Sequence, residues 1–313
     1  MSGVNKIEFP IVSVIINCYN GELFIKEAID SVFKQSYKNW EIIFWDNCSI
    51  DNSSIIAKSY GYKLKYYKSE FNTTLGEARN LAIKKTNGKY ICFIDTDDIW
   101  SNPNKLTLQV KMMESNKDLA LCYGSIQEVY KDGSFFRNVI TKLHSGFIFD
   151  KLLLQFDISI ITSMLRKSIL LDSSLNFDNN IKASEEFCLF MQLASKYKIG
   201  VSREIMAKYR VHQTSLTSQS LSILGKERRY TLDLIIKSSP ILYFKYKKQF
   251  KEAYARADYY DARWHMSNGE KKKAIKLLIK NIRVNYKYLL LLIVSIFPIY
   301  FWNKIHLIKR NRF

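Results

Sequence analysis

The stretch FIDTDDIW, residues 93–100, decides the fold of the chain. Apolar residues run directly into three carboxylates within four positions, Asp95, Asp97 and Asp98. Carboxylates this close repel one another and are costly to bury, so the group predicts a cation at the end of a buried strand. A D-x-D pair suits a divalent ion with oxygen ligands, to which a diphosphate can bind. The alternative is a solvated loop that caps the next helix.

Upstream of this stretch, short apolar runs alternate with helical patterns. We expect strands at residues 11–17, 40–45, 63–69 and 89–95, separated by helices at 22–36, 53–60 and 75–88. This β-α-β order predicts an α/β fold with a mostly parallel sheet and helices on both faces. Downstream we expect a helix at 104–117, a strand at 119–130, a helix at 184–197, and a helical region beyond 215.

Polar residues follow three of the expected strands at the point where each strand ends. They are Tyr19–Asn20, Asp46–Asn47 and Asp95–Asp98. Open α/β sheets bind ligands beyond the carboxyl ends of their strands, so the three clusters predict one crevice. Neither a GxxxxGK[ST] loop nor a GxGxxG fingerprint occurs. We therefore expect a metal ion, helped by an Arg, to neutralise bound phosphates.

Five segments in order give the chain a resemblance to the family 2 glycosyltransferases of the GT-A fold. They are VSVIINCYN, EIIFWDNCSIDNS, LGEARNLAIKKTNGKYICFIDTDDIW, SEEFCLFMQLA and KYRVHQTSLT. Together they span roughly residues 10–217, about two thirds of the chain. The resemblance implies an inverting, metal-dependent enzyme that moves a sugar from a nucleoside-diphosphate donor, a UDP-sugar first of all. The implied acceptor is a hydroxyl of a glycan or lipid-linked glycan in bacterial surface-polysaccharide assembly.

The resemblance also implies nucleotide-binding roles. Tyr19 would pack on the base, and Asp46 would hydrogen-bond its ring nitrogen. Arg79 would hold the base or the diphosphate. Asp95, with Thr96 beside it, would hold the ribose side. Each residue also has a structural interpretation, such as Asp46 capping the following turn or Arg79 lying solvated on its helix.

Metal binding and catalysis fall to residues in three segments. Asp97 would ligate Mn²⁺ or Mg²⁺, and His212 would reach the same metal or the diphosphate. Glu186 stands where the family usually has an Asp and would be the general base, with the neighbouring Glu185 as an open alternative. A second departure is Asp46-Asn47-Cys48-Ser49, where family members often have Asp-Asp-Gly-Ser.

Composition bounds the compartment and the partners. The net charge is +19, but residues 241–313 hold 17 Lys and Arg against 4 Asp and Glu, so the excess belongs mostly to the tail. A nucleic-acid partner is therefore not expected. The 5 cysteines are scattered and form no CxxC, which favours reduced thiols in the cytoplasm. No charged segment followed by an apolar run opens the chain, so we expect no signal peptide.

The C-terminal part predicts a membrane-associated extension. We expect a GT-A domain over residues 1–220 and a helical extension over 221–313, with an apolar, basic segment at about 286–313. Its core, YLLLLIVSIFPIYFW at 288–302, is short for a membrane span, contains Pro298 and is flanked by basic residues. We interpret it as a peripheral anchor on the anionic inner face of the cytoplasmic membrane, the alternative being a buried core helix. A non-catalytic, membrane-associated nucleotide-sugar-binding subunit remains the alternative function.

Overall fold

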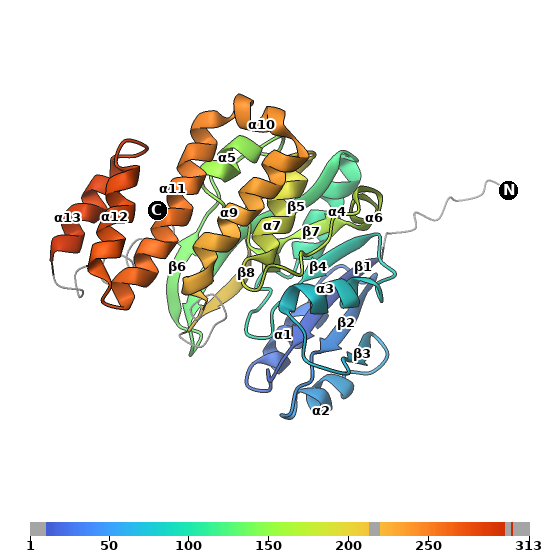
Figure 1. The fold of residues 1–313 in the computed structure, drawn as a ribbon. Coiled ribbons are helices and arrows are strands. Elements are labelled where there is room, and N and C mark those ends of the chain that lie inside the picture. Colours follow the sequence, from blue (N-terminus) through green and yellow to red (C-terminus); the bar gives the residue numbers. More distant parts are fainter. Residues whose placement is uncertain (1–10, 213–219, 298–301, 303–313) are drawn as a thin grey trace. The chain divides into compact units, whose positions relative to one another are not determined.

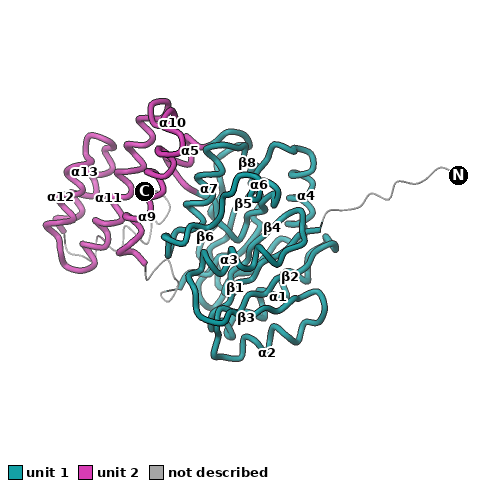
Figure 2. Tube along the Cα trace, turned by 45° about the vertical axis from the view of Figure 1, so that its right-hand side comes forward, with its two compact units in different colours: residues 1–148, 157–212 teal, residues 149–156, 213–313 magenta. Residues whose placement is uncertain are grey.

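The computed structural model describes residues 11–212, 220–297 and 302 (Figure 1). The chain forms two compact units, which Figure 2 shows in different colours. Unit 1 comprises residues 1–148 and 157–212, and unit 2 comprises residues 149–156 and 213–313. The domain boundary expected at residue 220 stays a prediction, because it adjoins residues 213–219, which lie outside the described part.

Unit 1 is built on one mixed sheet. The strands lie in the order β3-β2-β1-β4-β7-β5-β6, and β8 pairs with β5. Their bounds are β1 Val12–Cys18, β2 Trp40–Asp46, β3 Leu64–Lys68, β4 Tyr90–Phe93, β5 Leu119–Tyr130, β6 Phe135–Val139, β7 Met164–Arg166 and β8 Lys198–Val211.

The first four strands form the parallel half that the sequence predicts. β1 pairs parallel with β2 and β4, and β2 pairs parallel with β3, which is the edge strand. The inner strands are buried along almost their whole length, as expected for contiguous β-branched runs covered on both faces. Parallel pairing brings the carboxyl ends of β1, β2 and β4 to the same edge.

The helices of unit 1 connect and cover these strands. α3 packs on β1 and β2, and α4 packs on β5 and β8. α3 is capped by Thr74, whose side chain accepts a hydrogen bond from the backbone N–H of Glu77. The helix bounds are α1 Ile25–Phe33, α2 Ser53–Lys58, α3 Leu75–Ile83, α4 Lys105–Ser115, α6 Lys167–Ser173 and α7 Glu185–Ala194, with a 3₁₀ turn at Ile160–Thr162.

The second half of the sheet was not predicted beyond β5. β7 pairs antiparallel with β4 and β5, and β6 pairs antiparallel with β5. β8 runs parallel to β5, with a further bridge between Ile99 and Lys208. β8 therefore reaches back to the loop that follows β4.

Unit 2 is helical in its described residues. Its elements are α5 Phe149–Leu154, α9 Leu221–Ser238, α10 Pro240–Lys245, α11 Lys247–Ser267, α12 Lys271–Asn281 and α13 Lys287–Ile296. α11 and α12 pack against each other within the predicted helical region, and Gly269 takes the left-handed conformation between them. A core that includes Tyr259, Tyr288 and Trp302 packs α11, α12 and α13 together.

The predicted apolar segment falls partly in this unit. α13 covers its first part, while residues 298–301 and 303–313 lie outside the described residues. Tyr288, Leu291 and Ser295 are buried, but Leu290 and Ile293 on the other face are exposed. Within the described residues, each helix is too short or too polar to cross a membrane.

Candidate active site

A buried network joins the end of β4 to the start of α7. Arg79 of α3 is only 2% exposed, and its guanidinium lies near the rings of both Phe93 and Phe177, at 5.9 and 5.5 Å from their centroids. It donates hydrogen bonds to Asp95 Oδ1 at 3.0 Å and to Glu185 Oε1. Although burial acts in the opposite direction, the charges of Glu185 and Asp95 raise the pKa of Arg79, so it stays cationic.

In this network Arg79 contacts carboxylates of the protein, which the sequence did not predict. The sequence predicts that Arg79 holds the base or the diphosphate, whereas its described partners are two carboxylates. Its geometry is that of a residue that positions Asp95, whose side chain is 33% exposed. Burial raises the pKa of Asp95, the charge of Asp97 adds to this, and Arg79 counteracts both. Contacts of Arg79 and Asp95 with a nucleotide stay predictions.

Asp97 and His212 lie together although 115 positions separate them. His212 Nε2 is 2.7 Å from Asp97 Oδ2, and both side chains are partly exposed. The bridge between Ile99 and Lys208 explains their proximity, because it fixes the end of β8 beside the loop that follows β4. The structure thus brings together the two residues that the resemblance assigns to a metal.

The pair fits a metal ion in its chemistry and its spacing. Two ligands bound at right angles at about 2.1 Å from one ion lie about 3 Å apart, close to the separation of this carboxylate oxygen and imidazole nitrogen. Among the described residues, no group of three or more His, Cys, Asp or Glu side chains is arranged to hold a metal. Asp97 and His212 would thus be two ligands of such an ion.

Asp98 links the loop that follows β4 to β8. It is 2% exposed, and its Oδ1 accepts a hydrogen bond from the backbone N–H of Arg210 at 2.8 Å. Burial raises the pKa of Asp98 well above its ordinary value, and the charges of Asp97 and Asp95 add to this. Arg210 also pairs with Glu27 of α1 and lies over the ring of Phe24. The sequence pattern placed Asp98 and Arg210 in motifs but did not predict their contact.

The loop that follows β2 is organised around Asp46. Asp46 is fully buried, and its two carboxylate oxygens accept from the backbone N–H of Ser49 at 2.7 Å and from the hydroxyl of Tyr66 at 2.5 Å. These bonds show Asp46 capping the following turn, which was the structural alternative to a role in base binding. A carboxylate oxygen keeps a second lone pair, so hydrogen bonding to a base stays a prediction. Tyr66 was missed, and the only signal was its place in the neighbouring strand.

The loop that follows β1 approaches Thr96 closely. Tyr19 is exposed at the end of β1, as a residue available to a ligand must be. Asn20 takes a left-handed backbone and accepts a hydrogen bond from the N–H of Ile50. A Cβ at Gly21 would lie 3.0 Å from Thr96 Cβ, so any larger residue would require the two loops to shift slightly apart. The predicted base contact of Tyr19 and nucleotide contact of Thr96 are untested.

The start of α7 distinguishes the two adjacent glutamates. Glu185 is buried and bonds to Arg79. Glu186, also in the first turn of α7, is partly exposed. The N-terminus of a helix favours negative charge in its first turn. Of the two, Glu186 is therefore the more accessible, and its role as the base stays a prediction.

Comparison with known proteins identifies the family. The sequence profile described as Glycosyl transferase family 2 matches residues 13–170, about half of the chain. The chain belongs to glycosyltransferase family 2. This confirms the predicted family and the class of enzyme.

Curated relatives agree with the assignment. An uncharacterized glycosyltransferase of Rickettsia prowazekii is 33% identical over 69% of this chain and 68% of its own length. A UDP-Glc:alpha-D-GlcNAc-diphosphoundecaprenol beta-1,3-glucosyltransferase of Escherichia coli, WfgD, is 30% identical over 69% of this chain and 83% of its own length. This chain spans well under half the length of other relatives that it matches, for example 38% of an uncharacterized glycosyltransferase of Rickettsia felis.

Solved structures confirm the GT-A fold. S. aureus TarS 1-349 in complex with UDP-GlcNAc has a TM-score of 0.62 and 21% identity, over 87% of this chain and 81% of that chain. The mannosyltransferase PcManGT from Pyrobaculum calidifontis in complex with GDP-Man and Mn2+ has a TM-score of 0.59 and 13% identity, over 89% and 77%. At these identities the likeness concerns the fold.

Proposed function

We propose that this family 2 enzyme is an inverting, metal-dependent glycosyltransferase that takes a sugar from a UDP-sugar. Its acceptor is a hydroxyl of a glycan or lipid-linked glycan in bacterial surface-polysaccharide assembly. The observation that carries the proposal is the pairing of Asp97 with His212 at the carboxyl edge of the sheet, beside the Asp95–Arg79–Glu185 network. Glu186 begins the helix to which that network leads.

The chain's own residues divide the chemical work. Glu186 accepts the proton of the acceptor hydroxyl as its oxygen attacks the anomeric carbon of the donor. Arg79 fixes Asp95 and Glu185, so the carboxylates beside the reacting groups are already oriented when the donor binds. Attack opposite the leaving diphosphate inverts the anomeric configuration and needs no covalent enzyme intermediate.

A Mn²⁺ or Mg²⁺ ion held by Asp97 and His212 would supply positive charge to the departing diphosphate. No P-loop or glycine-rich dinucleotide fingerprint is present in the sequence to do so with backbone amides. The complex of PcManGT with GDP-Man and Mn2+ supports this choice by analogy of fold. We assign Asp97 to the metal and His212 to the metal or the diphosphate.

The choice of donor and acceptor rests on the relatives. WfgD is named for UDP-Glc and a diphosphoundecaprenol acceptor, and TarS was solved with UDP-GlcNAc. A putative teichuronic acid biosynthesis glycosyltransferase of Bacillus subtilis, TuaG, is 27% identical over 67% of this chain. These names favour a uridine donor and a bacterial surface-glycan product. Exposed Tyr19 and buried Asp46 are the residues that we propose recognise the uracil.

A lipid-linked acceptor would place the enzyme at a membrane, and unit 2 has properties that suit one. Residues 271–313 contain 11 Lys and Arg and no Asp or Glu. The exposed apolar side chains of α13 lie within this basic segment. A basic segment with an apolar face binds anionic membrane surfaces. We propose peripheral association with the inner face of the cytoplasmic membrane.

The experiment that tests the activity is a screen of UDP- and GDP-sugars for hydrolysis and for thermal stabilisation, with Mn²⁺ and with excess chelator. We expect a UDP-sugar to be hydrolysed and to stabilise the protein only when the metal is present. Asp97→Ala should abolish both effects. Asp172→Asn, at an exposed acid on α6, is the matched control and should change neither. Equal donor binding in chelator, or by the Asp97 variant, would rule out the metal-dependent proposal.

A further inference from the structure

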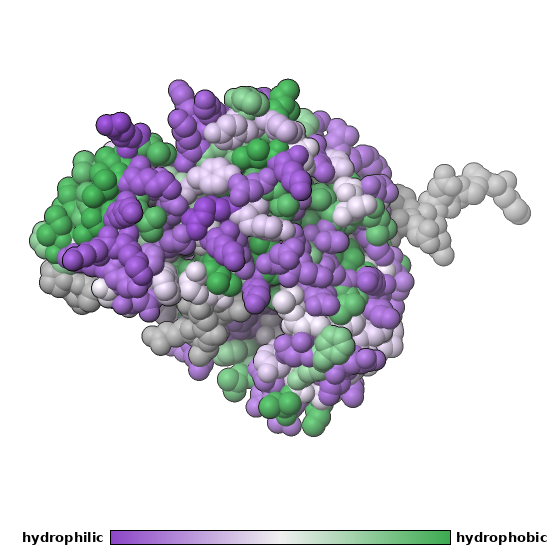
Figure 3. Space-filling model, viewed as in Figure 1, coloured by the Kyte–Doolittle hydropathy of each residue, from purple (hydrophilic) through white to green (hydrophobic). Residues whose placement is uncertain are grey.

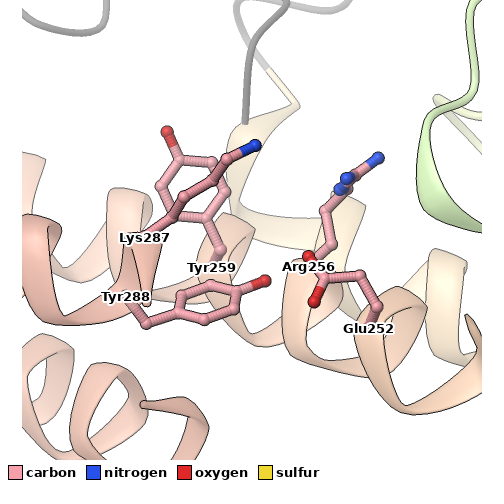
Figure 4. A pocket seen from close by; sticks show the side chains of 5 residues that line it. All are labelled: Glu252, Arg256, Tyr259, Lys287 and Tyr288. Atoms are coloured by element: carbon pink, nitrogen blue, oxygen red, sulfur yellow. The ribbon is translucent and has the colours of Figure 1, made fainter. Parts of the chain in front are cut away.

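A polar pocket lies between α11 and α13 in unit 2. Glu252, Arg256 and Tyr259 of α11 line it together with Lys287 and Tyr288 at the start of α13 (Figure 4). The hydroxyl of Tyr288 points toward the side where Glu252 and Arg256 lie. Three cationic or hydroxyl donors, Arg256, Lys287 and Tyr288, therefore meet in one pocket.

Arg256 lacks a carboxylate partner within the described residues. Its Nε is buried there without a hydrogen-bond partner. Burial lowers the pKa of Arg256 and the charge of Arg228 adds to this, whereas Tyr260, Tyr288 and the carboxylate of Glu252 act in the opposite direction. A buried guanidinium with an unsatisfied donor is costly, and an anion that accepts from it would remove that cost.

The acids of α11 are engaged by other residues. Asp258 accepts from Arg229 at 3.1 Å and from Lys280 at 2.9 Å. Asp261 also accepts from Arg229. Glu252, the acid that lines the pocket, accepts from Asn285 Nδ2 at 3.2 Å. The sequence offers no further acid from residue 271 onward. Of these acids, Glu252 lies in the pocket but does not accept from Arg256 Nε, so an anion from another molecule could supply that acceptor.

An exposed apolar face begins beside the pocket. Leu289, Leu290, Ile293, Ile296 and Phe297 are 43%, 47%, 46%, 68% and 52% exposed. Their spacing of three or four positions places them on one face of α13 and its end. Figure 3 shows hydrophobic side chains gathered where Figure 1 shows α13. A ligand that matches both the cationic pocket and this apolar face has a phosphate and a long apolar chain.

We propose that this pocket binds the phosphate of an anionic membrane lipid, with the exposed face of α13 against the acyl region of the bilayer. The inference rests on the membrane association proposed above and deepens it by naming the headgroup site. Arg256 and Lys287 donate charge-assisted hydrogen bonds to the phosphate oxygens, and Tyr288 donates a neutral one. The basic surface of α12 attracts the bilayer without distinguishing lipids.

The test is flotation of the full chain with phosphatidylcholine vesicles, with and without phosphatidylglycerol. Wild type should bind the anionic vesicles in preference. A hydrogen bond to a charged group contributes about 1.5–3 kcal/mol, so Arg256→Gln should weaken anionic-vesicle binding about 10- to 150-fold. Lys251→Gln, at an exposed cation of the same helix, should cost at most about fivefold. Ile293→Ser should weaken binding to both kinds of vesicle.

Further measurements separate the possible failures. Arg256→Gln removes a buried donor nitrogen that has no acceptor, so its thermal unfolding midpoint should equal or exceed that of wild type. Equal binding by Arg256→Gln and Lys251→Gln would overturn the pocket while leaving the membrane association intact. Wild type that hydrolyses a UDP-sugar but binds no vesicles would overturn the membrane association and leave sugar transfer standing. Thermal stabilisation by inorganic phosphate of wild type but not of Arg256→Gln, together with equal vesicle binding by the two proteins, would make it a free-phosphate site.

Discussion

Replacing Arg79 by Met tests the buried network most directly. Met keeps much of the length of the side chain and removes its charge. The loss leaves Glu185, whose side chain is 3% exposed, without its cation. Asp95 also loses a hydrogen bond, but at 33% exposure it is partly compensated by water. Removing one partner of a buried ion pair costs about 3–5 kcal/mol, so we expect the free energy of unfolding to fall by that amount.

A double-mutant cycle identifies the source of this loss. Glu185→Met removes the uncompensated charge, so the double variant should be more stable than Arg79→Met alone. The assay is denaturant unfolding monitored by tryptophan fluorescence, with donor hydrolysis measured in parallel. Hydrolysis should stay low in both variants, because neither holds Asp95 in place. Stability and activity should thus separate in the double variant.

An exposed pair provides the control for the cycle. Lys198 and Asp118 form a 2.9 Å ion pair whose side chains are 37% and 68% exposed. Lys198→Met should therefore cost about 1 kcal/mol or less. The reasoning is refuted if Arg79→Met costs no more than Lys198→Met, or if the two network substitutions have additive effects.

Three further predictions address catalysis, pH and packing. Glu186→Gln should lower kcat about 10²- to 10⁴-fold while donor-induced thermal stabilisation is unchanged, and a variant with full turnover would exclude Glu186 as the base. Although burial acts in the opposite direction, hydrogen bonds from Lys89, Tyr90 and Lys117 lower the pKa of Glu114 to about 2. Glu114→Gln should therefore lower the free energy of unfolding at pH values above 4.5, and its difference from wild type should shrink as the pH falls toward 2. Denaturant unfolding of both proteins at several pH values would measure this difference. Gly21→Ala should cost about 1–3 kcal/mol in unfolding free energy, because its Cβ would lie 3.0 Å from Thr96; an unchanged midpoint would mean that the two loops separate easily.

The parallel half of the sheet could be predicted because its signals are local. β1, β2 and β4 are buried on both faces, and each appears in the sequence as a contiguous apolar run. β5 was predicted at its observed bounds for the same reason. β7 was missed because it has only three residues, and β6 because its side chains are largely exposed. β8 was missed because charged residues interrupt its partly buried pattern.

The candidate site was predicted as a set of residues but not as a network. The motifs supplied Asp97, His212 and Glu186 through the family resemblance. The bond between Arg79 and Glu185 joins positions 106 apart, and no periodicity within either helix indicates it. The sequence interpretation therefore assigned Arg79 to the ligand, where the structure shows it between carboxylates. Spacing along the chain identifies candidates, whereas tertiary packing decides which of them face each other.

β8, which was not predicted, is the strand on which the pairing of Asp97 with His212 depends. β8 pairs with β5 up to Val211, so the register of these two strands fixes the position of the next residue, His212. The bridge from Lys208 to Ile99 ties the same strand to the loop that carries Asp97. A slip of one residue would move His212 by about 3.3 Å and turn the neighbouring side chains to the opposite face. The distance between Asp97 and His212 is thus set by sheet pairing, because His212 directly follows a strand that is paired up to Val211.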